Sequence, residues 1–188
     1  LADHLSGIFA SYGILAALHA RTITGEGQLV ETSLLQSMVS FVQENAANYF
    51  EESQVPRRDT RPRGPQAHCF VAGDCLPFVI HLSSPEKFWV GLTDAVGRPE
   101  MRDDARFADR PARTQHYDEL HDLLADAFAA APRDEWISRL REKDVPCSPL
   151  NTLEEVFQDP QVQAPGMSID LERPGAVSYT LLTLPTKG

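Results

Sequence analysis

A stretch dense in proline and arginine interrupts this chain and constrains its fold more than any other feature. Between Ser53 and Gln66 the residues that set the local character are Pro56, Arg57, Arg58, Arg61, Pro62, Arg63, Gly64 and Pro65. Proline fixes φ and removes a backbone donor, so neither a long helix nor a central strand continues through such a segment. The sequence therefore predicts a linker or an active-site loop over residues 53–65, with a folded part on each side.

The part before the linker is patterned as helix, turn, strand and helix. Apolar residues recur at helical spacing over residues 5–21, and a glycine-punctuated turn follows at residues 24–28. Residues 29–33 alternate apolar and polar side chains, as a half-buried strand does. A second helix is expected from Ser33 or Leu34 to about Phe50. This order is typical of an α/β domain.

The part after the linker mixes short strands with helices. The patterns first predict a hairpin over residues 68–82 that turns at Gly73-Asp74, and then a helix capped near Ser83 to Glu86 and stopped by Gly97. Helices over residues 114–130 and 133–143 and an extended segment over residues 145–150 follow. The last predicted elements are a helix over residues 153–158, capped by Asn151-Thr152 and closed by Pro160 and Pro165, and strands within residues 167–187 around a turn at Arg173-Pro174-Gly175.

Composition excludes several classes of function. A net charge of −10 disfavours nucleic acid and anionic membrane surfaces as partners. The uncharged run from Leu5 to Ala20 is too short and too polar to span a bilayer. Six histidines and three cysteines show no metal-ligand or disulfide spacing, so we expect no metal site and a reducing, cytoplasmic location. We expect no targeting signal, because no basic segment followed by an apolar core stands before the first predicted helix.

Asp3 is the carboxylate with the most informative position, because it stands just ahead of the first predicted helix. Aspartate is among the best N-capping residues, which gives Asp3 a structural role. A helix N-terminus also stabilises a reactive anion, which gives it a chemical role. Spacing alone leaves both interpretations open.

Two other groups invite a chemical interpretation. The arginines between residues 57 and 63 either bind an anionic ligand or are solvated. His68-Cys69 suggests a cysteine nucleophile, but adjacent side chains of a strand point to opposite faces. We therefore predict that Cys69 is buried and inert.

A series of motifs resembles the class III CoA-transferases, the family of formyl-CoA and crotonobetainyl-CoA transferases. In chain order the matching segments are Asp3-His4-Leu5-Ser6-Gly7, Gly13–Arg21, Thr24–Gln28, Val30–Ser33, Ile80–Trp89, Asp104–Phe107, Arg113, Glu135-Trp136, Val145–Pro149, Asp159–Gln161 and Leu184–Lys187. The resemblance covers nearly the whole chain.

The resemblance implies an activity and a set of site residues. Asp3 matches the family's nucleophile, which forms an aspartyl-CoA thioester while CoA passes from an acyl-CoA donor to a carboxylic acid acceptor. It also implies substrate contacts for His4, for Leu34 near the acyl pocket, and for Gly64 in the loop over the site. Leu34 has an equally simple interpretation as a core leucine. The family's formyl-CoA enzymes carry a run of glycines where this chain has Arg61-Pro62-Arg63-Gly64-Pro65, which argues against small, formate-like acyl groups.

The resemblance also implies an architecture. The fold would be α/β. Residues 1–52 would come from the middle of a Rossmann-like large domain that binds CoA, and residues 53–65 would be the linker. Residues 66–165 would form a smaller α+β domain, and residues 166–188 would be the strand segment that returns to the large domain. Members are interlocked homodimers, use CoA as a substrate and hold no permanent cofactor. On this basis we expect the chain to be an internal part of a longer protein and inactive alone.

Two alternative functions follow from the same residues. The related α-methylacyl-CoA racemases move a proton with a histidine and an aspartate. They have a different sequence pattern where this chain reads His81-Leu82-Ser83-Ser84-Pro85, and the histidine that they need would lie upstream of Leu1. A non-catalytic interaction domain is the other alternative, with Asp3 as a helix cap and the arginine-rich segment as a plain linker.

Overall fold

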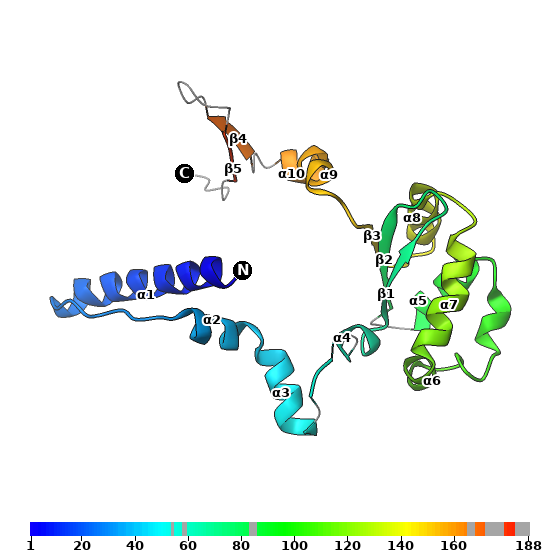
Figure 1. The fold of residues 1–188 in the computed structure, drawn as a ribbon, viewed down its shortest axis with the longest axis horizontal. Helices are drawn as coiled ribbons and strands as arrows, with labels where there is room; N and C mark the ends of the chain where they lie inside the picture. Colours follow the sequence, from blue (N-terminus) through cyan, green and yellow to red (C-terminus); the bar gives the residue numbers. More distant parts are fainter. Residues whose placement is uncertain (54, 58–59, 83–85, 165–167, 172–178, 183–188) are drawn as a thin grey trace. The chain divides into compact units, whose positions relative to one another are not determined.

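A computed structural model describes residues 1–53, 55–57, 60–82, 86–164, 168–171 and 179–182 (Figure 1). The chain divides into two compact units, Leu1–Thr60 and Arg61–Gly188. The boundary falls inside the arginine-rich segment that the sequence marks as a linker. Each unit is described by itself below.

In its described residues, unit 1 consists mainly of the helices α1, α2 and α3. The helix α1 (Ala2–Thr24) ends at Gly25, whose φ of 78° is the left-handed value that glycine adopts without strain. The helix α2 (Leu34–Phe41) begins at Ser33, whose side chain accepts a hydrogen bond from the Gln36 backbone N–H. Val42 then separates α2 from α3 (Gln43–Glu52), so the single helix predicted to Phe50 is two helices.

The strand predicted over residues 29–33 is not formed. The alternation of side chains is real, but a strand needs the backbone of a neighbour, and the described part of unit 1 contains no other strand. The segment instead packs against α1. A Cβ placed on Gly13 would lie 2.6 Å from Val30 Cγ1, so the missing side chain leaves room for the Val30 side chain against α1.

The linker contains a one-turn helix, α4 (Thr60–Arg63), where the sequence predicts only a loop. Pro62 is compatible with it because N–H groups of a first helical turn have no partner within the helix.

The sheet of unit 2 has three antiparallel strands in the order β1 (Ala67–Val71), β2 (Pro77–His81) and β3 (Cys147–Pro149). Phe70 pairs with Phe78 across the predicted hairpin, which is therefore confirmed. The turn requires glycine, because a Cβ on Gly73 would lie 2.6 Å from the Ala129 carbonyl oxygen. The extended segment predicted over residues 145–150 supplies β3, as expected.

Helices cover one face of this sheet. They are α5 (Glu86–Ala95), a 3₁₀ turn η1 (Pro99–Arg102), α6 (Arg110–Gln115), α7 (Tyr117–Phe128) and α8 (Arg133–Glu142). Phe128 lies at the centre of the core, with its ring edge-on to Phe78 at 5.0 Å and to Trp136 at 5.1 Å between centroids. Leu120 and Leu124 are fully buried beside it. The aromatic contacts and the buried leucines make unit 2 a domain with its own core.

The helix predicted over residues 114–130 is divided at His116 into α6 and α7. The helical region also begins further upstream than predicted, at Arg110, because Asp109 caps α6 by accepting a hydrogen bond from the Ala112 backbone N–H at 2.8 Å. Pro111 follows in the first turn, where proline is favoured.

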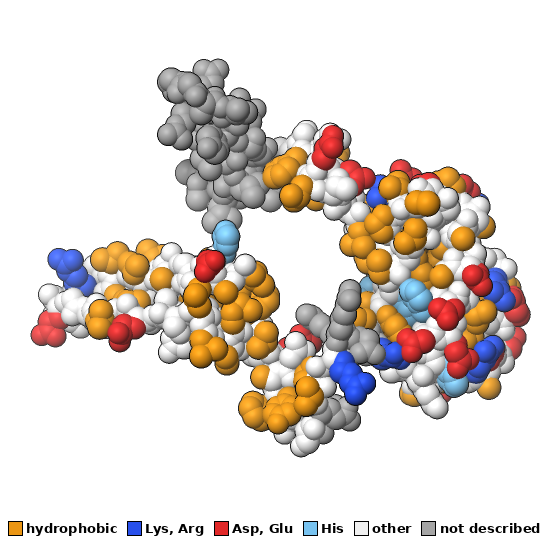
Figure 2. Space-filling model, in the orientation of Figure 1, with side chains coloured by type: hydrophobic (Ala, Val, Ile, Leu, Met, Phe, Trp, Pro, Cys, Tyr) orange, Lys and Arg blue, Asp and Glu red, His pale blue; other side chains and the backbone are white. Residues whose placement is uncertain are grey.

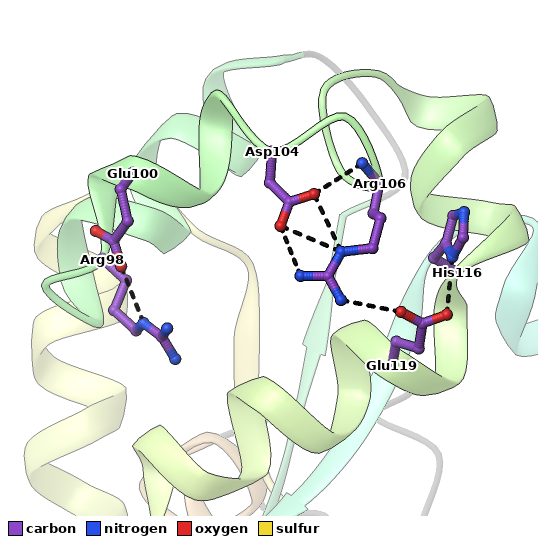
Figure 3. A network of polar contacts seen from close by, with 6 residues as sticks. All are labelled: Arg98, Glu100, Asp104, Arg106, His116 and Glu119. Carbon is purple, nitrogen blue, oxygen red and sulfur yellow. Dashed lines mark hydrogen bonds and ion pairs between the residues drawn. The ribbon is translucent and has the colours of Figure 1, made fainter.

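A polar network ties the loop before α6 to the first turns of α7 (Figure 3). Arg106 donates to both carboxylate oxygens of Asp104 and, at 3.0 Å, to Glu119, which also contacts His116 at 2.9 Å. These bonds from Arg106 lower the pKa of Asp104 to about 2. A separate pair, Arg98 and Glu100, lies at the start of η1.

The C-terminal elements follow the predicted order with one correction. The helix α9 (Leu153–Gln158) begins with a capping box between Thr152 and Glu155, as the sequence predicts. Pro160 does not simply close this helix: it begins α10 (Pro160–Gln163), because Asp159 caps the new turn.

Two of the strands predicted within residues 167–187 are present: β4 (Ser168–Leu171) pairs antiparallel with β5 (Tyr179–Leu182). The predicted turn at residues 173–175 and the predicted cap at residues 83–85 lie outside the described residues. Within the described ranges, no helix has the length and apolar character needed to cross a membrane.

Candidate active site

Asp3 lies in the first turn of α1, one residue past the start of the helix. It is not the N-cap: that position is Leu1, which makes no side-chain capping bond, so the capping interpretation of Asp3 is wrong. The side chain of Asp3 is exposed to solvent. Unpaired N–H groups and the positive end of the helix dipole stabilise a carboxylate in this position.

The other candidates in unit 1 are also exposed. His4 follows Asp3 in the first turn, and Leu34 is the first residue of α2. Leu34 is 50% exposed, so it is not a core leucine of this unit. A pocket of about 240 Å³ lies between α1 and α2, but its walls are Phe9, Gly13, Val30, Glu31, Thr32, Gln36, Ser37 and Ser40. The structure thus places Asp3, His4 and Leu34 in one unit without gathering them in this pocket.

Gly64 belongs to unit 2. It is exposed in the turn that follows α4, and its carbonyl oxygen accepts a hydrogen bond from Arg110 Nη2 at 2.9 Å. The four candidate residues are therefore divided between the two units.

Unit 1 exposes an apolar surface along its helices (Figure 2). Among the described residues of its helices only Ser37 is buried, whereas large apolar side chains on α1 and α2 are at least half exposed: Ile8, Tyr12, Ile14, Leu15, Leu18, Ile23, Leu34, Leu35, Val39 and Phe41. An apolar surface of this kind is typical of one that other protein segments cover.

A pocket of about 470 Å³ in unit 2 was not predicted from the sequence. It is lined by Pro62, Ala67, His68, Cys69, Val79, Tyr117, Asp118 and His121. His68 is 2% exposed and stacks on Tyr117 with 4.1 Å between ring centroids, but neither of its ring nitrogens has a hydrogen-bond partner among the described residues. Cys69 points to the other face and is exposed, so the prediction of a buried cysteine is wrong.

The pKa of His68 is lowered to about 3, mainly because the side chain is buried. The neighbouring His121 contributes to this lowering, and its effect is larger than the opposite effect of Asp118. The ordinary pKa of a histidine in an unfolded chain is about 6.5. Between these two values the unfolded state binds more protons than the folded state. The stability contribution of neutral His68 is therefore complete above pH 6.5 and is lost as the pH falls.

We predict that unit 2 loses up to about 1.4 kcal/mol of unfolding free energy per pH unit below pH 6.5 through His68. Replacing His68→Phe keeps a ring in the stack and removes the titrating group, so the pH dependence should flatten. Urea unfolding followed by the fluorescence of Trp89 and Trp136, both in unit 2, measures this. His81→Phe, at an exposed histidine of β2, is the control. An equally steep pH dependence in His68→Phe would show that another group causes it.

No group of three or more histidine, cysteine, aspartate or glutamate side chains that could hold a metal ion is present in the described parts of the chain.

With the fold and these residues in place, comparison with known proteins identifies the family. The whole chain, residues 1–188, matches the family model of CoA-transferase family III, and the chain belongs to that family. The resemblance drawn from the sequence motifs is thereby confirmed.

Curated relatives and solved structures agree with this assignment. A succinyl-CoA:mesaconate CoA-transferase of Haloarcula hispanica is 30% identical over 93% of this chain and 43% of its own length. An acetyl-CoA:oxalate CoA-transferase of Acetobacter aceti is 30% identical over 90% of this chain and 43% of its own length. The crystal structure of a CAIB/BAIF family protein from Brucella suis matches the whole chain with a TM-score of 0.82 at 30% identity, over 48% of that protein. The chain spans less than half the length of these proteins. The helix-rich α/β fold with a small three-stranded sheet is the expected class.

Proposed function

We propose that the protein transfers CoA from an acyl-CoA donor to a carboxylic acid acceptor. The match of the entire chain to CoA-transferase family III carries this proposal. Relatives whose names state the transfer of CoA from an acyl-CoA to an acid, such as from succinyl-CoA to mesaconate, support the same substrate class. Transfer of this kind exchanges one thioester for another of similar energy, so it needs no energy source and no permanent cofactor beyond CoA as a substrate.

Asp3 is the proposed nucleophile. Aspartate carboxylates are ionised at neutral pH, so the group needs no base to attack a thioester. A carboxylate oxygen of Asp3 attacks the acyl carbonyl, the carbon–sulfur bond breaks, and a mixed anhydride and CoA thiolate form. The thiolate attacks the aspartyl carbonyl of the anhydride, which releases the donor acid and leaves an aspartyl-CoA thioester.

The second half of the cycle reverses these steps with the acceptor. The acceptor carboxylate attacks the aspartyl-CoA thioester and expels the thiolate, which then attacks the acceptor's carbonyl in the new anhydride. The product acyl-CoA leaves and the Asp3 carboxylate is regenerated. A closed site must exclude water throughout, because water would hydrolyse the anhydride.

The remaining architecture is proposed from the family. Residues 1–52 would belong to a Rossmann-like large domain, residues 66–165 to the small domain, and residues 166–188 to the return segment, in an interlocked, cytoplasmic homodimer. The exposed apolar side chains on α1 and α2 support this, because further segments of a large domain or a partner chain would cover them. His4, Leu34 and Gly64 are the proposed substrate contacts.

The decisive experiment incubates the full-length protein with acyl-CoA and no acceptor. We expect a covalent CoA adduct, sensitive to hydroxylamine, on the peptide that contains Asp3, detected by mass spectrometry. Addition of an acceptor acid should discharge it. An enzyme of the racemase kind would form no adduct and would exchange the substrate's α-proton with deuterated water, and a plain interaction domain would do neither.

A further inference from the structure

We propose that Arg63 is a positioning residue that clamps the linker around Gly64 onto α7. This inference rests on the proposed function, in which Gly64 contacts substrate. Arg63 does not itself touch the reactants in this proposal. Its role is to fix where the next residue lies in unit 2.

The side chain of Arg63 is held from two directions. Its Nη2 donates to both carboxylate oxygens of Asp118, at 2.9 and 2.7 Å. Its guanidinium carbon lies 4.9 Å from the centroid of the Tyr117 ring, within the range of a cation–π interaction. Asp118 is 74% exposed, so the ion pair alone is weak, but the two bonds to one carboxylate and the ring contact together orient the Arg63 side chain, which is 28% exposed.

Tyr117 is in turn fixed to the sheet. Its ring stacks on buried His68, and its hydroxyl donates to the carbonyl oxygen of Ala67 at the start of β1. Arg63 therefore packs on a side chain that is anchored in the domain.

Hydrogen bonds from side chains and backbone fix the residues that follow Arg63. Arg110 Nη2 donates to the Gly64 carbonyl, and the Gln66 backbone N–H donates to the Arg63 carbonyl at 3.2 Å. Gln66 itself is 1% exposed, and its side chain donates to the Arg110 carbonyl at 3.1 Å and accepts from Arg113 Nε at 3.2 Å. The segment from Arg63 to Gln66 is thus attached at several points to α6 and α7.

These attachments have a consequence for a site that includes Gly64. The segment holds a single glycine between Pro62 and Pro65, and its position is set by side-chain contacts from outside the segment. Misplacement of a substrate-contacting group by about 1 Å can cost about a hundredfold in rate. Release of the clamp should therefore lower kcat/KM while unit 2 stays folded.

The chain offers a closely matched control for this test. Asp118 and Glu119 are adjacent in the first turn of α7, and each forms an ion pair with an arginine. Asp118 holds the linker through Arg63, whereas Glu119 holds Arg106 in the network before α6 (Figure 3). Asp118→Ala and Glu119→Ala thus remove equivalent charges from one helix turn, but only the first releases the linker.

Two measurements on the full-length protein distinguish the variants. The first is the rate of trypsin cleavage after Arg63, because Arg63 must leave Asp118 to enter the protease, with cleavage after Arg57 as the internal reference. The second is kcat/KM for CoA exchange, with the melting temperature recorded to show that unit 2 is folded. For Asp118→Ala we expect cleavage after Arg63 to rise about three- to fivefold and kcat/KM to fall by a similar factor, the scale set by an exposed ion pair. Glu119→Ala should change both by less than about twofold.

The possible outcomes separate this proposal from the proposed function. Unchanged cleavage after Arg63 in Asp118→Ala would overturn the clamp, whatever the activity. Faster cleavage with unchanged kcat/KM would overturn its positioning role. Faster cleavage in a protein whose wild type exchanges no CoA would support the clamp and overturn the proposed function.

Discussion

Replacing Asp3→Ala in the full-length protein is expected to lower the rate of CoA exchange by at least about a thousandfold, the effect typical of removing a nucleophile. The affinity for CoA should stay within about tenfold, because the small exposed side chain adds little to the binding of a large ligand. Exchange of label between acyl-CoA and free acid measures the rate, and calorimetry measures the affinity.

A second acidic residue in a first helical turn provides the control. Glu44 lies in the first turn of α3, in the same unit as Asp3, and has no proposed chemical role. Glu44→Ala should retain exchange within about twofold, as most exposed substitutions do. Retained exchange in Asp3→Ala would rule out Asp3 as the nucleophile, and loss of CoA binding together with exchange would indicate a misfolded site instead.

Unit 2 is the part of the fold that its sequence predicts best. Alternation around Phe70 and Phe78 with a glycine between them identifies the hairpin, and the spacing of Leu120 and Leu124 identifies α7. Thr152 and Glu155 mark the start of α9 through local capping chemistry. These signals succeed because each depends on residues that are close in sequence and because the unit buries its own core.

Unit 1 is predicted less well because its pattern depends on neighbours that the described residues do not supply. Residues 29–33 alternate like a strand, yet no strand of the unit lies beside them. The start of α6, which lies upstream of the predicted helix, is a different kind of error. Asp109 followed by Pro111 is a local helix-start signal, and it could have been found in the sequence.

The candidate site shows the same division between local and distant information. The sequence predicts Asp3 just ahead of a helix that starts near residue 5, but the helix begins at Ala2, so Asp3 lies inside its first turn and the capping role is wrong. The opposite orientation of His68 and Cys69 was predicted from strand geometry, but which of the two is buried depends on α7 packing against β1. The contact between Arg63 and Asp118 joins residues 55 positions apart, so no spacing rule finds it.

Replacing Arg113→Ala is expected to destabilise unit 2 by about 2–4 kcal/mol, mainly through its buried hydrogen bonds, because its ion-pair partner Glu86 is 59% exposed and stays solvated. Arg113 is 4% exposed and joins three parts of the unit. Its guanidinium donates to Glu86 at 3.1 and 3.2 Å, to the Phe107 carbonyl at 2.9 Å and to Gln66 at 3.2 Å, and it lies 4.8 Å from the Trp89 ring. Removal leaves the buried acceptors of Phe107 and Gln66 without this donor, which adds their desolvation cost.

Two further variants test whether buried geometry, rather than positive charge, causes this loss. Arg113→Lys keeps the charge but has no planar fork to reach Glu86, Gln66 and the backbone together, so it should recover less than half of the stability. Arg98→Ala removes an arginine of the same unit whose side chain is 40% exposed and paired with Glu100 at 3.1 Å, and should cost less than about 1 kcal/mol. Urea unfolding followed by the fluorescence of Trp89 and Trp136 measures all three. If Arg113→Lys were as stable as the wild type, charge alone would be sufficient at this position. If Arg113→Ala cost no more than Arg98→Ala, the bonds around Arg113 would not hold the start of the hairpin to α5 and α6.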